Sequence, residues 1–198
     1  MNIGEKFNFK GFEWVVLDVD GDAVTAIMTK AYVTAPFDEN NMNKWLTSTI
    51  RKRLYDELLP VLGKENLITH ITDMVADNGD TRYGTMEDEI WLISCDEFRK
   101  YRKIIIENCD FDDDWWWTLT PWYITDVGSG YYVRSVKSDG GVYGSYAGSS
   151  GGVAPACVFH LQSLMRPDRD ATSEIAMLKN RITRLENRLR ELEETYEE

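Results

Sequence analysis

Between Trp115 and Phe159 the chain alternates short apolar runs with glycine- and serine-rich steps, which limits this region to short strands joined by turns. The segment holds four of the seven tryptophans and five of the ten tyrosines. Tyrosine and tryptophan supply large contact area at low side-chain entropy cost, while serine and glycine supply adaptable hydrogen bonds. The sequence therefore predicts a recognition surface in this region.

The length and charge of the chain narrow the class of protein. At 198 residues, the chain is long enough for one domain with a core and an appendage. Its formal net charge of -12 disfavours nucleic acid as a partner, because phosphate binding needs a concentrated lysine and arginine face. The first residues lack a basic segment followed by an apolar one, and no stretch approaches the ~20 apolar residues that span a bilayer. We expect no signal peptide, no membrane partner and a cytoplasmic or virion-associated protein.

The N-terminal residues predict a β-hairpin. Residues 7–18 and 23–29 are rich in β-branched and aromatic residues, and the sequence Asp20-Gly21-Asp22 between them is typical of a turn. A further strand is expected at residues 89–93, and the acidic run at residues 110–114 is expected to be a loop.

Two helices are predicted in the globular part. In residues 45–62 apolar side chains recur at helical spacing, and Pro60 and Gly63 are expected to end the helix. These apolar positions are Leu46, Ile50, Leu54 and Leu58. Later in the chain, Ser94 can cap a second helix while Glu97 reaches back from the third helical position.

Side chains that carry chemistry are few. Three widely spaced cysteines, Cys95, Cys109 and Cys157, favour reduced buried thiols over disulfides. His70 and His160 stand in no spacing typical of a catalytic triad or a zinc site. The acidic run could bind Ca²⁺, but it lacks the glycine and distal glutamate of an EF-hand loop, so a solvated loop is favoured. We therefore expect no cofactor, no metal and no enzymatic activity.

The last residues predict a coiled coil. Apolar side chains recur at spacings of three and four and form an a/d seam, for which Ser173 can serve as the N-cap. The seam consists of Ile175, Leu178, Ile182, Leu185, Leu189, Leu192 and Tyr196. Residues 166–172 are polar and broken by Pro167, so we expect a linker there and an oligomerisation helix at residues 173–198.

The seam predicts association between copies of the chain. Charged residues occupy its flanking e and g positions, as expected beside a second chain, although an amphipathic helix packed on its own domain is the alternative. Residues 181–186 and 188–193 each resemble an Arg-apolar-x-x-apolar-Glu signature associated with three-stranded coiled coils. We therefore favour a homotrimer over a homodimer, and either state would make binding multivalent.

Five short motifs occur in order along the globular part. They are Gly11-x-Glu13-Trp14-x-Val16-Leu17-Asp18, Trp45-x-x-Ser48-x-Ile50-Arg51-x-x-Leu54, Leu92-Ile93-Ser94-x-x-Glu97, Trp116-Trp117-x-x-Thr120-Pro121 and Gly152-Val-Ala-Pro-Ala156. Together they resemble an uncharacterised bacterial and phage domain family related to the C-type lectin fold and to formylglycine-generating enzymes, a fold also used by variable proteins of diversity-generating retroelements. The resemblance covers residues 4–162 and departs from the family at Leu119 and Ala154, where arginine is usual.

The resemblance implies an α+β, C-type lectin-like domain over residues 1–165, with small twisted antiparallel sheets, two helices and long loops. It also implies an exposed ligand-binding face in the C-terminal third. The residues offered for this face are Tyr123, Asp126, Tyr131, Arg134, Ser138, Tyr143, Ser145, Tyr146 and Ser149. Trp115, Trp116, Trp117 and Trp122 are expected to be scaffold. Because neighbours in a strand face opposite ways, we expect one of Trp116 and Trp117 to be buried.

Three classes of function remain open. The favoured one is a non-enzymatic, receptor- or adhesin-like binding protein for an unknown protein or glycan, carried by a phage or prophage and diversified by a retroelement. The second is a structural or virion accessory protein that oligomerises through its coiled coil. The third is a modifying enzyme of the formylglycine-generating type. Such relatives need a working cysteine pair, whereas Cys109 and Cys157 lie outside the motifs that carry the resemblance and can equally be buried apolar residues.

Overall fold

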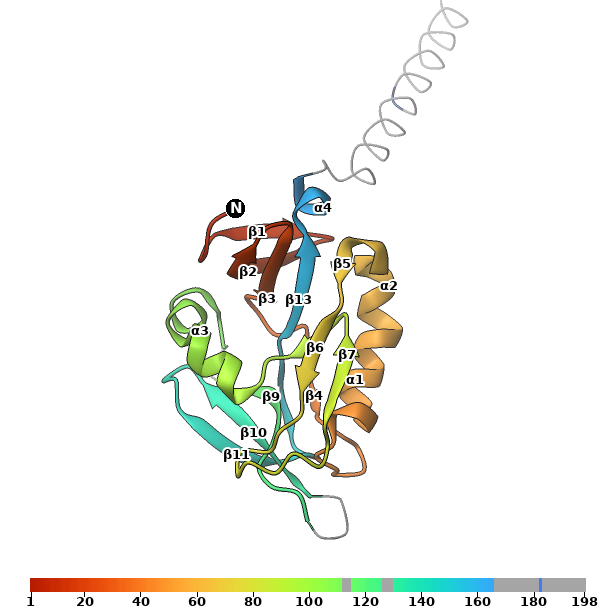
Figure 1. Ribbon diagram of the computed structural model, residues 1–198, viewed down its shortest axis with the longest axis vertical. Helices are drawn as coiled ribbons and strands as arrows, with labels where there is room; N and C mark the ends of the chain where they lie inside the picture. Colours follow the sequence, from red (N-terminus) through yellow and green to blue (C-terminus); the bar gives the residue numbers. More distant parts are fainter. Residues whose placement is uncertain (112–114, 126–129, 166–181, 183–198) are drawn as a thin grey trace, which may run out of the picture. The chain divides into compact units, whose positions relative to one another are not determined.

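The computed structural model describes residues 1–111, 115–125, 130–165 and 182 (Figure 1). The chain divides into two compact units, Met1–Ser163 and Leu164–Glu198. The first unit combines helices with several small, mainly antiparallel sheets, so the predicted α+β class is confirmed. Of the predicted coiled-coil seam only Ile182 is described, and it is helical and 54% exposed. The other seam residues and the linker at residues 166–172 lie outside the described residues.

The first sheet joins the beginning of this unit to its end. Its strands are β1 (Lys6–Phe9), β2 (Phe12–Asp20), β3 (Ala23–Met28), β13 (Pro155–His160), β5 (Leu67–Ile68) and β8 (Trp91–Leu92). They follow the order β1-β2-β3-β13-β5, and β8 also pairs with β13. The predicted turn around Gly21 is confirmed, because Asp20 pairs with Ala23 across it.

The strand predicted at residues 7–18 is instead two strands. Lys10 and Gly11 have positive φ angles of 51° and 84°, and they turn the chain so that Phe9 pairs with Phe12. A two-residue turn with positive φ at both positions matches the twist of the strands that it joins, and glycine adopts this backbone at little cost. The strand predicted at residues 89–93 is shorter than expected and consists of β8 alone.

The second sheet is built largely from the segment that alternates apolar runs with glycine. Its strands are β11 (Val142–Tyr146), β10 (Tyr132–Lys137), β9 (Trp115–Pro121), β12 (Ser150–Val153) and β4 (Val33–Pro36), in this order. β9 and β12 are parallel neighbours, and the other pairs are antiparallel. The predicted alternation of strands and turns after Trp115 is therefore confirmed. A third sheet pairs β6 (His70–Asp73) with β7 (Thr85–Asp88).

The helix predicted at residues 45–62 is a succession of short helical turns. They are η1 (Trp45–Thr47), α1 (Thr49–Arg53), the π-helical η2 (Leu54–Leu58) and α2 (Leu59–Leu62). Pro60 lies within α2 and does not end it, whereas Gly63, with a φ of 77°, does. Because Pro60 has no amide hydrogen, it cannot donate a regular α-helical bond to the preceding turn, and the adjacent π-helical turn is consistent with this loss.

The first turn of this segment presents a different side chain to the core than expected. Leu46 is 42% exposed, whereas Trp45 is fully buried. Trp45 is held inward because its indole Nε1 donates a hydrogen bond to Asp88 Oδ2 at 2.8 Å. Of the four apolar positions at helical spacing, Ile50, Leu54 and Leu58 are therefore buried, and Leu46 is not.

The second predicted helix, α3 (Cys95–Asn108), begins with the expected capping box. Ser94 Oγ accepts a hydrogen bond from the Glu97 amide at 3.1 Å, and Glu97 Oε2 accepts one from the Ser94 amide at 2.7 Å. The short helices η3 (Lys64–Asn66) and α4 (Leu161–Met165) complete the described elements. No helix in the described part of the chain is long and apolar enough to cross a membrane.

Tryptophans from distant parts of the sequence form the core. Trp14, Trp45, Trp91 and Trp117 are all fully buried. Trp116, the neighbour of Trp117 on β9, is buried as well, so both faces of this strand are covered. We expected one of these two tryptophans to be buried, and the structure buries both. This packing fixes the middle of the second sheet and leaves the β10–β11 hairpin at its edge.

Candidate functional site

The β10–β11 hairpin lies at one edge of the second sheet (Figure 1). It carries most of the exposed aromatic residues predicted for the site. In its register Tyr132 opposes Tyr146, and Ser135 opposes Tyr143. Cross-strand partners share one face of a sheet, and successive residues alternate between faces. Tyr146 and Tyr143 therefore lie on opposite faces of the hairpin, so the expected single surface carrying both does not form.

Three rings gather on the Tyr146 side of the hairpin, and we call Trp122, Tyr132 and Tyr146 the aromatic face. The ring centroids of Trp122 and Tyr132 are 5.4 Å apart in an edge-to-face arrangement, and those of Tyr132 and Tyr146 are 4.2 Å apart. Trp122 is 39% exposed and Tyr146 is 52% exposed. A hydrogen bond with Tyr146 raises the pKa of Tyr132 further above its ordinary value, at which a phenol is already neutral at physiological pH. The face is thus a contiguous, uncharged aromatic surface in contact with solvent.

Gly144, which has no side chain, and the charged Arg134 hold the indole of Trp122 in place. A β-carbon at Gly144 would overlap the ring carbons of Trp122, so the indole lies directly against the backbone of β11. The Arg134 guanidinium lies 4.4 Å from the centre of the same indole in a cation–π contact. Arg134 and Gly144 are cross-strand partners, which places all three residues on one face of the hairpin.

Asp77 fixes the guanidinium of Arg134. Asp77 Oδ2 accepts hydrogen bonds from Arg134 Nε at 3.0 Å and from Nη2, and Asp77 Oδ1 accepts one from Arg99 Nη2 at 3.3 Å. Burial alone would raise the pKa of Asp77, but the hydrogen bonds and charges of the two arginines outweigh burial, so the pKa lies below its ordinary value. Asp77 therefore stays ionised at neutral pH and balances the charge of Arg134.

Asn43 anchors the loop that leads into the hairpin, and its side chain is fully buried. Asn43 Nδ2 donates hydrogen bonds to the carbonyls of Tyr123 at 2.8 Å and Tyr132 at 3.1 Å. Asn43 Oδ1 accepts hydrogen bonds from the Gly130 amide at 3.1 Å and the Tyr83 hydroxyl at 2.8 Å. One side chain thereby uses its full hydrogen-bonding capacity to connect both ends of the loop.

The other residues predicted for the site are dispersed. Tyr131 is 49% exposed just before β10. Tyr143 is 44% exposed on the opposite face, where Lys137 Nζ lies 5.0 Å from its ring centre and Asp139 accepts its hydroxyl hydrogen bond at 3.2 Å. The remaining positions are Ser138 and Ser149, which are exposed, Tyr123 and Ser145, which are half-buried, and Asp126, which lies outside the described residues.

Sequence reasoning missed several residues that build the aromatic face. It assigned Trp122 to the scaffold and gave no role to Tyr132, Asn43 or Asp77. Alternation along β10 places Tyr132 and Arg134 on the same face of that strand. Placing Tyr146 on this face as well requires the register between β10 and β11. Asn43 and Asp77 act on the face from loops far away in the sequence, and their local sequence carries no signal of this.

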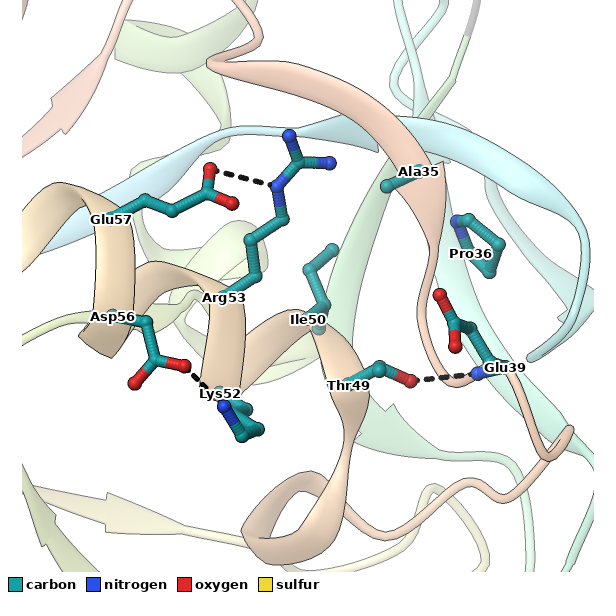
Figure 2. Close-up of a pocket in the computed structure, with 9 residues that line it drawn as sticks. All are labelled: Ala35, Pro36, Glu39, Thr49, Ile50, Lys52, Arg53, Asp56 and Glu57. Atoms are coloured by element: carbon teal, nitrogen blue, oxygen red, sulfur yellow. Dashed lines mark hydrogen bonds and ion pairs between the residues drawn. The ribbon is translucent and has the colours of Figure 1, made fainter.

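A cavity of about 360 Å³ lies between β4 and the helical turns around α1 (Figure 2). Its two cations face acidic neighbours one helical turn away. Lys52 pairs with Asp56, and Arg53 Nε lies 3.0 Å from Glu57 Oε2. Among the described residues of its lining, no cation is left to select an anionic ligand, so the aromatic face is the better candidate site.

The three cysteines have free thiols, as predicted. Burial raises the pKa of Cys157 well above its ordinary value and raises that of Cys109 to about 12. Burial also raises the pKa of Cys95, against the opposing effect of hydrogen bonds with Thr118 and Thr120. Because the thiolate is the reactive form of cysteine, these environments are poorly suited to thiolate chemistry at neutral pH.

Each histidine contacts one carboxylate. His70 stacks on Trp91 with ring centroids 4.0 Å apart and lies 3.5 Å from Glu97 Oε1. His160 Nδ1 lies 2.9 Å from Asp22 Oδ2. A catalytic triad also needs a hydroxyl or thiol bonded to the imidazole, and no such bond is found among the residues described. Within the same ranges, no group of three or more His, Cys, Asp or Glu side chains is placed to hold a metal ion.

Comparison with known proteins gives one match. A family model described as a domain of unknown function (DUF6273) matches residues 14–161, a span from within β2 to the start of α4. It includes the whole second sheet, the aromatic face and the first sheet apart from β1 and the first residues of β2. No curated protein and no solved structure matches the chain.

Proposed function

We propose that this chain, which belongs to the DUF6273 family, is a non-enzymatic ligand-binding protein and that the aromatic face is its binding surface. The observation that carries the proposal is a set of three contacting rings, two of them well exposed, on a hairpin at the edge of a packed sheet. Tryptophan and tyrosine are enriched among the residues that contribute most to binding, because they bury a large area with few rotatable bonds.

The surroundings of the face support binding without rearrangement. Gly144 and Arg134 confine Trp122, and Asn43 holds the backbone at Gly130 and Tyr132. A surface that is already ordered loses less conformational entropy when a ligand binds, so more of the contact energy appears as affinity. The raised thiol pKa values of Cys109 and Cys157 support leaving cysteine chemistry out of the proposed activity.

The finer fold and assembly belong to the same proposal. A C-type lectin-like fold is supported by the shared sheet of the first and last strands, with the second sheet formed mostly between them in sequence. A coiled-coil homotrimer of residues 173–198 would place three aromatic faces on one stalk and raise avidity. If a phage or prophage retroelement diversifies the protein, a near copy of the coding segment for residues 115–160, differing only at adenines, should lie near the gene.

The test is a screen of the full chain against a random peptide display library and a glycan array. The tightest ligand recovered is then measured on Tyr146→Ser by isothermal titration calorimetry. We expect this substitution to weaken binding at least about tenfold, because aromatic residues at the centre of an interface each contribute more than about 1.4 kcal/mol.

The matched control is Tyr143→Ser. Tyr143 lies on the same strand with similar exposure but on the opposite face, so its loss should change affinity less than about twofold. Urea unfolding of both variants checks that neither substitution disrupts the hairpin. If Tyr143→Ser abolishes binding while Tyr146→Ser does not, the aromatic face is not the binding surface.

A further inference from the structure

The outer edge of β11 is the end of a sheet. β11 is the first strand in the order β11-β10-β9-β12-β4, so among the described strands it pairs only with β10, along its inner edge. The Ala147 amide donates to the Tyr131 carbonyl at 2.8 Å, and the Lys137 amide donates to the Gly141 carbonyl at 3.1 Å. Both pairs continue the β10–β11 register, in which hydrogen-bonded pairs alternate with non-hydrogen-bonded ones. The odd-numbered residues of β11 therefore bond to β10.

The even-numbered residues of β11 consequently turn their backbone groups towards the free edge. These residues are Val142, Gly144 and Tyr146. The Tyr146 carbonyl accepts a hydrogen bond from the Ser149 amide at 2.8 Å within the following turn. The other outward groups are the amide and carbonyl of Val142 and Gly144 and the amide of Tyr146, and no described residue bonds to them. They form a row of donors and acceptors with the spacing of a β-ladder.

This edge lacks the usual protection against pairing with another chain. Sheet edges are normally protected by charged side chains, proline, bulges or short length. β11 has five residues, none charged and none proline, and its register with β10 is unbroken. The other edges in the described sheets are protected: β1 carries Lys6, β4 ends at Pro36, β5 and β8 have two residues each, and β6 and β7 carry acidic residues.

We propose that β11 binds an extended, positively charged peptide segment as an added antiparallel strand, an inference that rests on the proposed function of the aromatic face and names its ligand class. Strand addition gives affinity through main-chain hydrogen bonds and specificity through alternate side chains. The net charge of -12 attracts a cationic segment and repels a second copy of this chain.

The rings of the aromatic face suit the side chains of such a segment. Alternate residues of the added strand lie on the aromatic-face side, next to Tyr146 and next to Gly144. Gly144 has no side chain, so the residue beside it reaches Trp122 directly. Trp122 already accepts the guanidinium of Arg134, and the exposed ring of Tyr146 offers a further site for arginine or lysine.

The probe for the test is a fluorescent seven-residue peptide of alternating threonine and arginine, and its binding to the full chain is measured by fluorescence anisotropy. In an antiparallel addition, the arginines opposite Gly144 and Tyr146 turn their amides towards β11. Methylation of the arginine amide nitrogens should therefore weaken binding at least about tenfold, whereas methylation of the threonine nitrogens should change it less than about threefold. A peptide with glutamate in place of arginine should bind at least about tenfold more weakly.

The matching variants of the protein are Val142→Pro and Val142→Thr. Proline removes the outward amide of Val142 without removing a bond to β10, whereas threonine keeps this amide. We expect at least about tenfold weaker binding of the unmethylated peptide to Val142→Pro and a change below about twofold for Val142→Thr. Urea unfolding of both variants establishes that the hairpin is intact.

The outcomes separate this inference from the proposed function. Equal binding of the peptide methylated on its arginine nitrogens, or of the glutamate peptide, would overturn strand addition by a basic segment. Unchanged binding to Val142→Pro together with loss in Tyr146→Ser would overturn edge pairing while the aromatic face remained the binding surface. A concentration-dependent increase in mass that Val142→Pro abolishes would assign the edge to a second copy and overturn the peptide proposal.

Discussion

The indole of Trp122 occupies the space that a β-carbon at Gly144 would need. Trp122 lies just after β9 and Gly144 lies on β11, the edge strand of the sheet. The Trp122 ring nevertheless rests against the backbone of β11 at Gly144. This contact spreads the aromatic face across both strands of the hairpin and explains why the position opposite Arg134 carries no side chain.

Gly144→Ala should displace Trp122 and lower the free energy of unfolding by about 1–3 kcal/mol, the usual cost of inserting a methyl group into occupied space. Urea unfolding measures the loss, and tryptophan fluorescence reports the displaced ring. Gly148→Ala is the milder comparison, because its new β-carbon would lie 3.3 Å from Asn41 Oδ1, a contact that a small shift relieves, whereas that of Gly144→Ala would overlap the Trp122 ring. Equal stability of Gly144→Ala and the parent would show that Trp122 is not confined by the glycine.

Asn43→Ala should destabilise the first unit by about 2–4 kcal/mol, because it removes a buried hydrogen-bond partner from two carbonyls, an amide and a hydroxyl. Chemical denaturation gives the free energy of unfolding. Asn40→Ala, at an exposed position, should change it by less than about 0.5 kcal/mol. A loss for Asn43→Ala no greater than that of the control would mean that the loop is held by other contacts.

The ion pairs of Asp77 should make stability depend on pH. The pKa of Asp77 is lowered in the folded chain, so the unfolded state binds its proton first as the pH falls. The stabilisation is therefore complete above the unfolded pKa of about 3.9 and is lost as the pH falls through the lower folded value. Asp77→Asn should be less stable than the parent at neutral pH, and the difference should shrink below about pH 4. A difference that stays constant between about pH 7 and about pH 3 would contradict this role.

The cysteines should be slow to react in the folded chain. Burial raises the pKa values of Cys157 and Cys109, so few thiolates form at neutral pH, and Cys157 is also sealed from solvent. A thiol-specific disulfide reagent should label the native protein at least about tenfold more slowly than the urea-unfolded protein. Rapid labelling of Cys157 in the native protein would contradict this prediction and would favour a reactive cysteine.

The features that could be predicted from sequence are those with local causes. The capping box of Ser94 and Glu97 lies within four residues, and the turn around Gly21 follows from its own composition. The α+β class is what the family resemblance implies, and the structure has both the helices and the strands that it requires. The turn at Lys10 and Gly11 had a local signal too, but the aromatic residues around it resemble one continuous strand.

The features that could not be predicted depend on partners far away in the sequence. Trp45 faces inward because the buried Asp88 carboxylate, 43 residues later, accepts its indole hydrogen bond. The split of the candidate residues between two faces depends on the β10–β11 register, in which a shift of one residue would exchange the faces of Tyr143 and Tyr146. Composition indicated the region of the candidate site but could not determine which of its side chains share a surface.

The most direct measurement of the central claim is the indole N–H resonance of Trp122 in a ¹⁵N correlation spectrum, assigned with Trp122→Phe and followed during titration with the tightest ligand from the screen. The buried Trp117 indole, whose Nε1 donates to the Ala35 carbonyl at 3.0 Å, serves as the internal reference. We predict that the Trp122 resonance shifts with the ligand while that of Trp117 stays in place. A saturating titration that leaves the Trp122 resonance unmoved would contradict binding at the aromatic face.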